Sequence, residues 1–180
     1  MRFILISAVL IFLMGCQGYN PVKPTNPPSE QLEIDTAIAK FKESSPGINA
    51  YFDNAYGYAI FPSVGKAGLG FGGARDTDGK VYEQGVYIGD ASLTEFNVGF
   101  QIGAQSFSEI IFFEDKESLT DFTESRYEFD AGASSVAASA GAATNADYDR
   151  GVAVFTRANG GLMVEASVGG QKFNYYPAYN

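Results

Sequence analysis

The sequence predicts an α+β fold in which short N-terminal helices and one inserted helix accompany a strongly curved, glycine-rich antiparallel sheet or a small closed β-barrel. Apolar residues recur at helical spacing before residue 57 and again near residue 119. From Tyr58 onward the chain is rich in glycine, β-branched and aromatic residues, which is typical of strands. Glycines inside strands permit sharp bending and close backbone approach, and therefore favour curvature over a flat sheet.

The first segment is an apolar leader that ends at the only cysteine of the chain. The run from Phe3 to Met14 is nearly all apolar. It is too short to span a bilayer, which needs roughly 20 apolar residues, but it suits a secretory signal. The following Gly15-Cys16 completes a segment that resembles a lipobox, although Met14 stands where Ala, Ser or Thr is commoner. We therefore expect residues 1–15 to be cleaved and Cys16 to be lipidated.

Lipidation at Cys16 predicts where the protein resides. A thioether to diacylglycerol and an acylated amino terminus, with palmitate among the acyl chains, bring about three chains at roughly 0.8 kcal/mol per buried methylene, enough for stable attachment. Gln17 is not Asp, which by resemblance to enterobacterial sorting rules favours the outer membrane. Residues 16–28 form a proline-rich tether of up to about 3.1 Å per residue. We expect a lipid-anchored protein of the bacterial cell envelope, on the periplasmic face of the outer membrane.

Residues 29–180 are expected to form a single domain that opens with two helices. Ser29 is a candidate N-cap, followed by an apolar stripe of Leu32, Ile34, Ala37, Ile38 and Phe41. Ser45-Pro46-Gly47 ends this helix and starts a shorter one, which presents Ile48, Tyr51, Phe52 and Ala55 on one face and ends at Gly57. Docking against the domain explains both stripes, and membrane or partner binding is the alternative.

The remaining elements are predicted strands and one helix. Two glycine dipeptides predict hairpin turns: Asp78-Gly79 between residues 66–75 and 80–89, and Asn159-Gly160 between residues 151–157 and 161–169. Further strands are expected at Leu93–Gln105, at Ser106–Phe113 and, with small side chains, at Ala131–Ala146. The inserted helix is expected at Asp115–Ser125, with Leu119 and Phe122 facing inward.

The composition excludes several function classes. The chain has no histidine, and its one thiol belongs to the expected anchor, which argues against His- and Cys-based nucleophilic catalysis and against zinc sites that use these residues. With no second thiol there is no intramolecular disulfide, so stability must come from packing. The formal net charge is −9 and the basic residues are scattered, whereas phosphate contacts need them clustered, so we expect no nucleic-acid partner.

Four motifs suggest chemistry but have simpler explanations. Residues 68–73 satisfy G-x-G-x-x-G, yet no helix N-terminus follows to hold a pyrophosphate. Ser63 and Lys66 fit S-x-x-K, but the surrounding Pro and Gly disfavour the helix that this motif needs. A partial calcium loop (Asp76, Asp78, Glu83) lacks essential ligands, and in the carboxylate group of Glu109, Glu114 and Asp115 the last is placed to cap the following helix. We therefore predict no catalytic residue, no metal site and no cofactor.

Five blocks follow one another along the chain: residues 56–68 with Gly70 and Gly72, residues 99–105, residues 108–113, residues 151–155, and residues 160–163 through 169–173. In this order they resemble the bacterial branch of the SYLF domain family. The resemblance spans nearly everything from about residue 34 to the end. It implies a non-enzymatic module that associates with phospholipids; eukaryotic relatives are linked to phosphoinositides through a basic N-terminal helix and to actin.

This chain departs from that pattern, because its helix Ser29–Ser44 sets Lys40 and Lys42 against four acids, Glu30, Glu33, Asp35 and Glu43. We expect lipid binding through apolar and shape contacts, and we do not carry actin binding over. The alternative is a structural envelope protein that meets a protein partner at the glycine-rich sheet; an enzyme would require a buried, facing carboxylate pair in a cleft. Lys66, Arg75 and Lys172 are candidates for headgroup contact, with solvated strand-end charges as the alternative.

Overall fold

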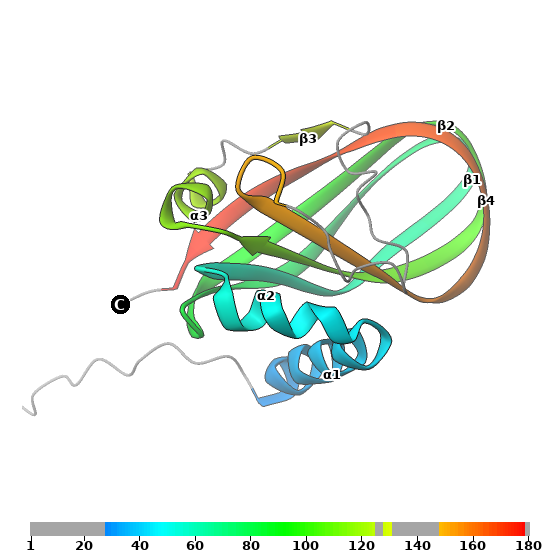
Figure 1. Ribbon diagram of the computed structural model, residues 1–180. Coiled ribbons are helices and arrows are strands. Elements are labelled where there is room, and N and C mark those ends of the chain that lie inside the picture. The colour runs from blue at the N-terminus through cyan, green and yellow to red at the C-terminus, as the bar shows by residue number, and fades with distance from the viewer. Residues whose placement is uncertain (1–27, 125–127, 131–147, 179–180) are drawn as a thin grey trace, which may run out of the picture.

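The computed structural model describes residues 28–124, 128–130 and 148–178. An N-terminal helix α1 (Pro28–Ser44) leads through a 3-10 turn (Pro46–Ile48) into the short helix α2 (Asn49–Asn54). Two long strands follow, β1 (Gly57–Glu83) and β2 (Val86–Phe113), and then helix α3 (Lys116–Thr123). A short strand β3 (Glu128–Asp130) and a third long strand, β4 (Val152–Pro177), complete the described chain (Figure 1).

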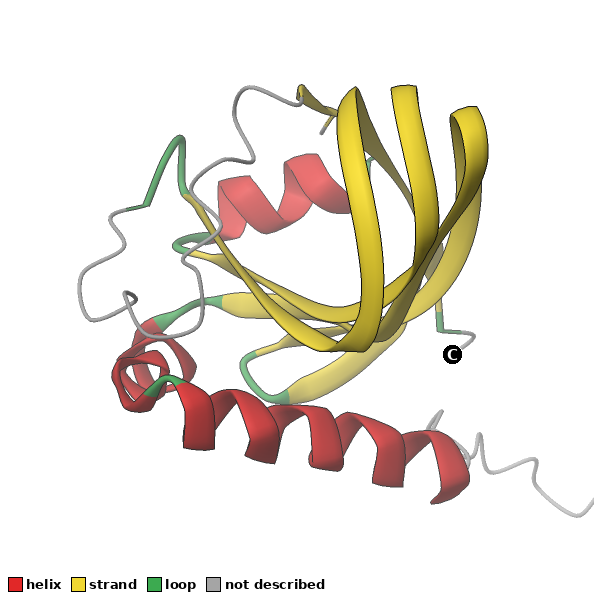
Figure 2. Ribbon diagram, turned by 90° about the vertical axis from the view of Figure 1, so that its right-hand side faces the viewer, coloured by secondary structure: helices red, strands yellow, loops and turns green. Residues whose placement is uncertain are grey.

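The strands form one antiparallel sheet that bends into a deep trough (Figures 1 and 2). Their order is β1-β2-β4-β3, with β1 and β3 at the edges. Register shifts at Phe61/Val64, Phe71/Gly73 and Ser106/Phe107 bend the long strands, because a bulge kinks its strand and increases its twist. No pairing joins the two edges among the described strands. The α+β class and the strongly curved sheet are confirmed, and the closed barrel is wrong.

The concave side of the trough holds one hydrophobic core. Helix α3 lies within the trough and buries Leu119 and Phe122 there (Figure 2). The ring of Phe173 on β4 lies 5.7 Å from that of Phe61 on β1 and 5.3 Å from that of Phe122. Since β1 and β4 are not neighbours in the sheet, these rings meet across the trough. The two walls are thus held together by aromatic packing.

The convex side holds a second core, covered by α1 and α2. Ile34, Ala37 and Phe41 of α1 are buried against the sheet, and so is Ile48 of the 3-10 turn. From the same region, Tyr51 packs edge-on against Phe155, with centroids 4.8 Å apart, and Phe52 packs edge-on against Phe112 at 4.9 Å. The prediction that both helical stripes dock against the domain is therefore confirmed. Leu32 belongs to the predicted stripe but remains 66% exposed.

The segment Ile110–Phe113 of β2 connects the two cores. All four of its side chains are 0% exposed. Because side chains alternate along a strand, Ile110 and Phe112 join the core under α1, while Ile111 and Phe113 face the trough. Burial on both faces explains why this stretch is continuously apolar instead of alternating with polar residues.

The predicted hairpin at Asp78-Gly79 is wrong. Strand β1 continues through it, and the chain turns instead at Gln84-Gly85, whose φ angles of 48° and 77° are those of a tight turn. Gly79 is required for close packing: a Cβ at this position would collide with the ring of Phe61, 2.5 Å from its Cε1 atom, and would lie 2.8 Å from the carbonyl oxygen of Ile60.

The second predicted hairpin, at Asn159-Gly160, is also wrong, because β4 runs through it. Phe107 pairs with Ala158 and Ser106 pairs with Gly160, which leaves Asn159 as the extra residue of a bulge. The two strands predicted at Leu93–Gln105 and Ser106–Phe113 are one strand, β2.

The predicted helices are close to the observed ones. Helix α1 begins at Pro28, so Ser29 lies inside it and is not its cap, and the predicted second helix is a 3-10 turn followed by α2. The inserted helix is confirmed as α3, two residues shorter at its C-terminal end than predicted. The strand predicted at Ala131–Ala146 lies outside the described residues.

Replacing Gly79 by alanine is expected to destabilise the domain by about 1–3 kcal/mol, because the added methyl group overpacks the contact with Phe61. Urea unfolding followed by circular dichroism measures the loss. Asp78→Ala is the matched control. Asp78 is the exposed neighbour of Gly79 on the same strand, and its replacement should change stability by less than about 0.5 kcal/mol. Equal stability of Gly79→Ala and the unsubstituted protein would contradict the packing argument.

Candidate functional site

A cleft of about 460 Å³ opens between α1 and the convex face of the sheet. Its volume lies in the range of roughly 300–1,000 Å³ that is usual for small-molecule sites. The lining residues come from α1 and from all three long strands: Leu32, Glu33, Thr36, Ala37, Lys40, Pro62, Ser63, Ser106, Ser108 and Asn159. We refer to it as the α1 cleft.

The sheet side of the α1 cleft is tied together by a hydrogen-bonded group from three strands. The hydroxyl of Ser108, a residue only 3% exposed, donates to the carbonyl of Pro62 at 2.7 Å and to Oδ1 of Asn159 at 3.0 Å. Nδ2 of Asn159 also donates to the Pro62 carbonyl, at 3.2 Å. Pro62 and Asn159 both lie at register shifts of the sheet. The cleft therefore forms where the regular ladder of β1, β2 and β4 is interrupted.

The helix side of the α1 cleft presents mixed polar chemistry. Glu33, Thr36 and Lys40 are spaced three and four residues apart and so share one face of α1. All three are exposed. Leu32 adds a large, exposed apolar side chain at the same wall. The wall thus offers one anion, one cation, one hydroxyl and an apolar contact.

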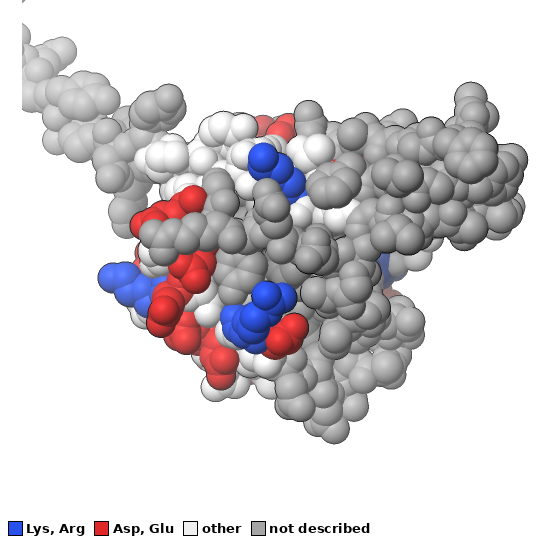
Figure 3. All heavy atoms as spheres, turned by 90° about the horizontal axis from the view of Figure 1, so that it is seen from above, with Lys and Arg blue, Asp and Glu red and all other residues white. Residues whose placement is uncertain are grey.

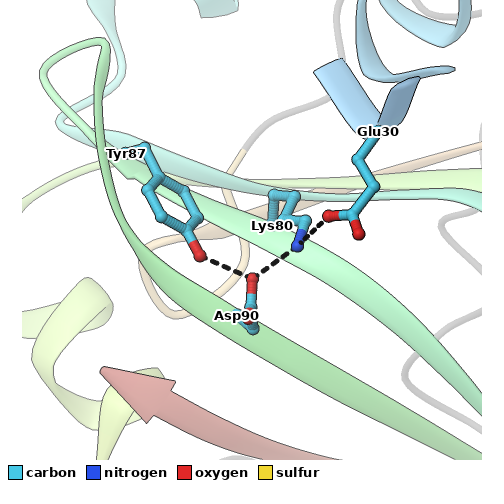
Figure 4. A network of polar contacts seen from close by, with 4 residues as sticks. All are labelled: Glu30, Lys80, Tyr87 and Asp90. Carbon is cyan, nitrogen blue, oxygen red and sulfur yellow. Dashed lines mark hydrogen bonds and ion pairs between the residues drawn. The ribbon is translucent and has the colours of Figure 1, made fainter. Parts of the chain in front are cut away.

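A polar network fixes the first turn of α1 to the sheet (Figure 4). Lys80 Nζ lies 2.6 Å from Glu30 Oε2 and 2.7 Å from Asp90 Oδ1, and the Tyr87 hydroxyl donates to the same Asp90 oxygen at 2.6 Å. Burial lowers the pKa of Lys80, but its hydrogen bonds to Asp90 and Glu30 outweigh burial and hold the pKa above its ordinary value. Lys80 therefore stays protonated and links α1 to the β1–β2 pair.

The three candidate headgroup residues occupy separate register positions of the sheet. Lys66 pairs with Gln105 of β2, while Arg75 pairs with Glu95, ten residues further back along the same strand. Lys172 is exposed on β4, where it is opposite Thr94 of β2 and Glu128 of β3. Lys172 is not among the described residues that line the α1 cleft. Their role in headgroup contact stays a prediction.

The carboxylates that follow the apolar run of β2 serve different structural roles. Asp115 is the N-cap of α3: its Oδ1 accepts from the Ser118 backbone at 2.9 Å and from the Ser118 hydroxyl at 2.8 Å. The backbone hydrogen bond lowers the pKa of Asp115. Glu114 is exposed, whereas Glu109 is buried and accepts a hydrogen bond from Gln171 at 2.9 Å. The predicted cap is confirmed.

The trough contains a second buried carboxylate besides Glu109. Glu95 is 8% exposed and lies on the same face of β2 as Leu93. Its register partner on β4 is Gln171, whose side chain donates a hydrogen bond to Glu109. Both carboxylates lie in the packed interior and not in the α1 cleft. Within the described residues, no group of three or more acidic or thiol side chains is arranged to hold a metal ion.

The glycine motif at residues 68–73 and the pair Ser63 and Lys66 all lie on β1. A strand provides neither the helix N-terminus that a dinucleotide site needs nor the one-turn spacing that S-x-x-K chemistry needs. The prediction that neither motif lies on or directly before a helix is confirmed. Cys16, like the rest of residues 1–27, lies outside the described residues, so its lipidation stays a prediction.

Comparison with known proteins agrees with this arrangement. Residues 94–180 match the Ysc84 family, described as Las17-binding protein actin regulator. Beta cell expansion factor A of Aeromonas veronii is 28% identical in an alignment of 148 positions that covers 77% of this chain and 53% of that protein. The chain thus spans about half the length of this curated relative.

The fold and the α1 cleft define an α+β domain built on an open, strongly curved antiparallel sheet with a helix-walled cleft on its convex face. Residues 94–180 of the chain match the Ysc84, or SYLF, family, and the resemblance predicted from the five sequence blocks is confirmed.

Lys80→Met is expected to loosen α1, because Glu30 and Asp90 would lose their common cation. A partly exposed ion pair contributes up to about 1 kcal/mol, which corresponds to roughly fivefold weaker protection of the α1 amides. Hydrogen exchange followed by mass spectrometry measures this, and Lys116→Met on the exposed start of α3 is the matched control. If the α1 amides exchanged equally fast in both variants, the network would not hold the helix.

Proposed function

We propose that this chain is an outer-membrane-anchored lipoprotein whose SYLF domain binds phospholipid in the α1 cleft. The observation that carries the proposal is the cleft itself, which combines Leu32, Ala37 and Pro62 with several hydroxyl groups in a domain of this family. A surface that is part apolar and part polar suits an amphiphile, because the acyl and glycerol parts need apolar contacts and the headgroup needs hydrogen bonds. No catalytic step is included.

The electrostatics favour contacts of shape and apolar area over attraction to anionic lipid. Acidic side chains gather over α3 when the molecule is seen from above (Figure 3). The exposed acids of that region are Glu114, Asp115, Glu117 and Glu124. The whole chain carries a formal charge of −9. A negatively charged protein gains little from an anionic lipid surface, so the lipid is bound as an individual molecule in a cleft.

The packing of α1 also supports binding of a single lipid in the cleft over insertion of the helix into a bilayer. An amphipathic helix binds a bilayer by laying its apolar face into the interface. In α1 that face is already occupied, since Ile34, Ala37 and Phe41 are 2–5% exposed against the sheet. In the described part of the chain, no helix has the length and apolar character needed to cross a membrane. Lipid is therefore bound beside the docked helix.

A second candidate function is a structural role through protein–protein contacts at the sheet. It is favoured by β1, a strand of 27 residues whose outer edge has no partner strand among the described residues. Such an edge can accept a strand from another protein. Crosslinking in intact cells that gave a reproducible protein adduct and no lipid adduct would favour this function over lipid binding.

Lipid binding in the α1 cleft is tested by titrating the full chain with short-chain dihexanoyl phospholipids below their micelle concentration, so that the acyl anchor does not enter the measurement. Leu32→Ala is expected to weaken binding roughly fiftyfold, because it removes three carbon groups that contribute about 0.8 kcal/mol each when they are buried against the lipid. Val86→Ala, which trims a similarly exposed side chain beside the β1–β2 turn, should bind like the unsubstituted chain. No binding of any phospholipid would contradict the proposal.

The anchor is tested by Cys16→Ser, which is expected to abolish labelling with radioactive palmitate because the acylated thiol is absent. Gln17→Asp is the matched variant: it should keep the label but move the protein to the inner-membrane fraction. Unchanged labelling of Cys16→Ser would refute lipidation at this residue, and unchanged fractionation of Gln17→Asp would refute the sorting argument.

A further inference from the structure

We infer that the α1 cleft selects a zwitterionic phospholipid whose headgroup carries a primary ammonium, that is, a phosphoethanolamine lipid. The inference rests on the proposed lipid binding and adds the identity of the headgroup. It is based on the charges, hydroxyl groups and apolar side chains that the described residues of the cleft present.

The cleft carries two opposite charges on one helix face. Glu33 and Lys40 are seven residues apart, about 10 Å along the helix axis, with Thr36 between them. Both are exposed, with long side chains that can converge on a group bound between them. A lysine ammonium is a good point-charge partner for a phosphate, and a carboxylate accepts the hydrogen bonds that a primary ammonium donates. The two charges match the two ends of a phosphoethanolamine headgroup.

The sheet side of the cleft supplies further donors for the phosphate. Ser63 and Ser106 line the cleft opposite α1, and each contributes a hydroxyl group. Ser108 and Asn159 are instead engaged with Pro62, so they shape the cleft. Leu32, Ala37 and Pro62 provide the apolar surface for the glycerol and the first methylenes of the acyl chains.

Other headgroups fit this set of residues less well. An anionic headgroup such as phosphoglycerol would leave the Glu33 carboxylate facing a lipid that has no cation, and like charges at close range repel. A choline headgroup has no N–H to donate, and proteins recognise quaternary ammonium groups with aromatic cages. Among the described residues that line the α1 cleft, none is aromatic. The primary ammonium is the cation that Glu33 can bind directly.

The cleft is also preorganised for this ligand. Burial of Ile34, Ala37 and Phe41 holds α1 against the sheet, and the ion pair of Glu30 with Lys80 holds its first turn. Glu33 and Lys40 lie on a helix whose position is fixed before the lipid arrives. A fixed site loses less conformational freedom on binding, which strengthens selection between headgroups of similar size.

The test compares the full chain with four soluble ligands: dihexanoyl phosphatidylethanolamine, phosphatidylcholine and phosphatidylglycerol, and free glycerophosphoethanolamine. Calorimetric titration at neutral pH should give about tenfold tighter binding of the ethanolamine lipid than of the other three. Glu33→Gln is expected to weaken binding of the ethanolamine lipid about tenfold. Its affinity for phosphatidylglycerol should be unchanged or higher. Lys40→Gln should weaken binding of all three lipids, since each carries a phosphate.

Two exposed residues outside the cleft give matched controls, Glu43→Gln on α1 and Lys116→Gln on α3, and both should bind like the unsubstituted chain. Equal affinity for the three lipids, or equal weakening of ethanolamine and glycerol lipids by Glu33→Gln, would overturn the headgroup assignment while lipid binding stands. Equal binding of free glycerophosphoethanolamine would overturn the assignment to a lipid. If no ligand bound, the proposed function would fail together with this inference.

Discussion

The structure depends on one constraint: the segment Ile110–Phe113 must be buried on both faces of the sheet. One face requires a wall on the concave side, which the sheet provides by bending over itself and enclosing α3. The other requires a cover on the convex side, which α1 and α2 provide. The wall-to-wall contact of Phe61 with Phe173 and the docking of Phe41 follow from the same requirement. The α1 cleft is then the place where the convex cover meets the bulged part of the sheet.

Much of the fold could be predicted from local patterns, and the errors have one physical origin. The periodicity of α1, the Asp115 cap of α3 and the curved glycine-rich sheet followed from short stretches of sequence. The two hairpin predictions were wrong. Gly79 is needed to admit the ring of Phe61, eighteen positions earlier, and Asn159 is the extra residue of a bulge opposite β2. A dipeptide pattern cannot distinguish a glycine that turns the chain from one that admits a neighbouring ring.

The candidate site was harder to predict, because its sheet side joins Pro62 and Asn159, which are 97 positions apart in the chain. No local pattern relates them. From the sequence, Lys40 counts only toward the net charge of its helix, in which acidic residues outnumber basic ones. The structure shows that position on the helix matters more than the total: Lys40 lines the cleft with Glu33, while Glu30 is paired with Lys80.

The Glu30–Lys80 ion pair also lies where a pull along the chain that precedes α1 would reach the domain. The chain that precedes the domain enters at Pro28, so tension along it reaches α1 at its first turn. There Glu30 is attached to β1 through Lys80, which is joined in turn to Asp90 of β2. The pull is passed directly to two long, extensively paired strands before it reaches the buried side chains further along the helix. If the domain is held at its N-terminal end, as proposed, this ion pair lies where the force would enter the fold.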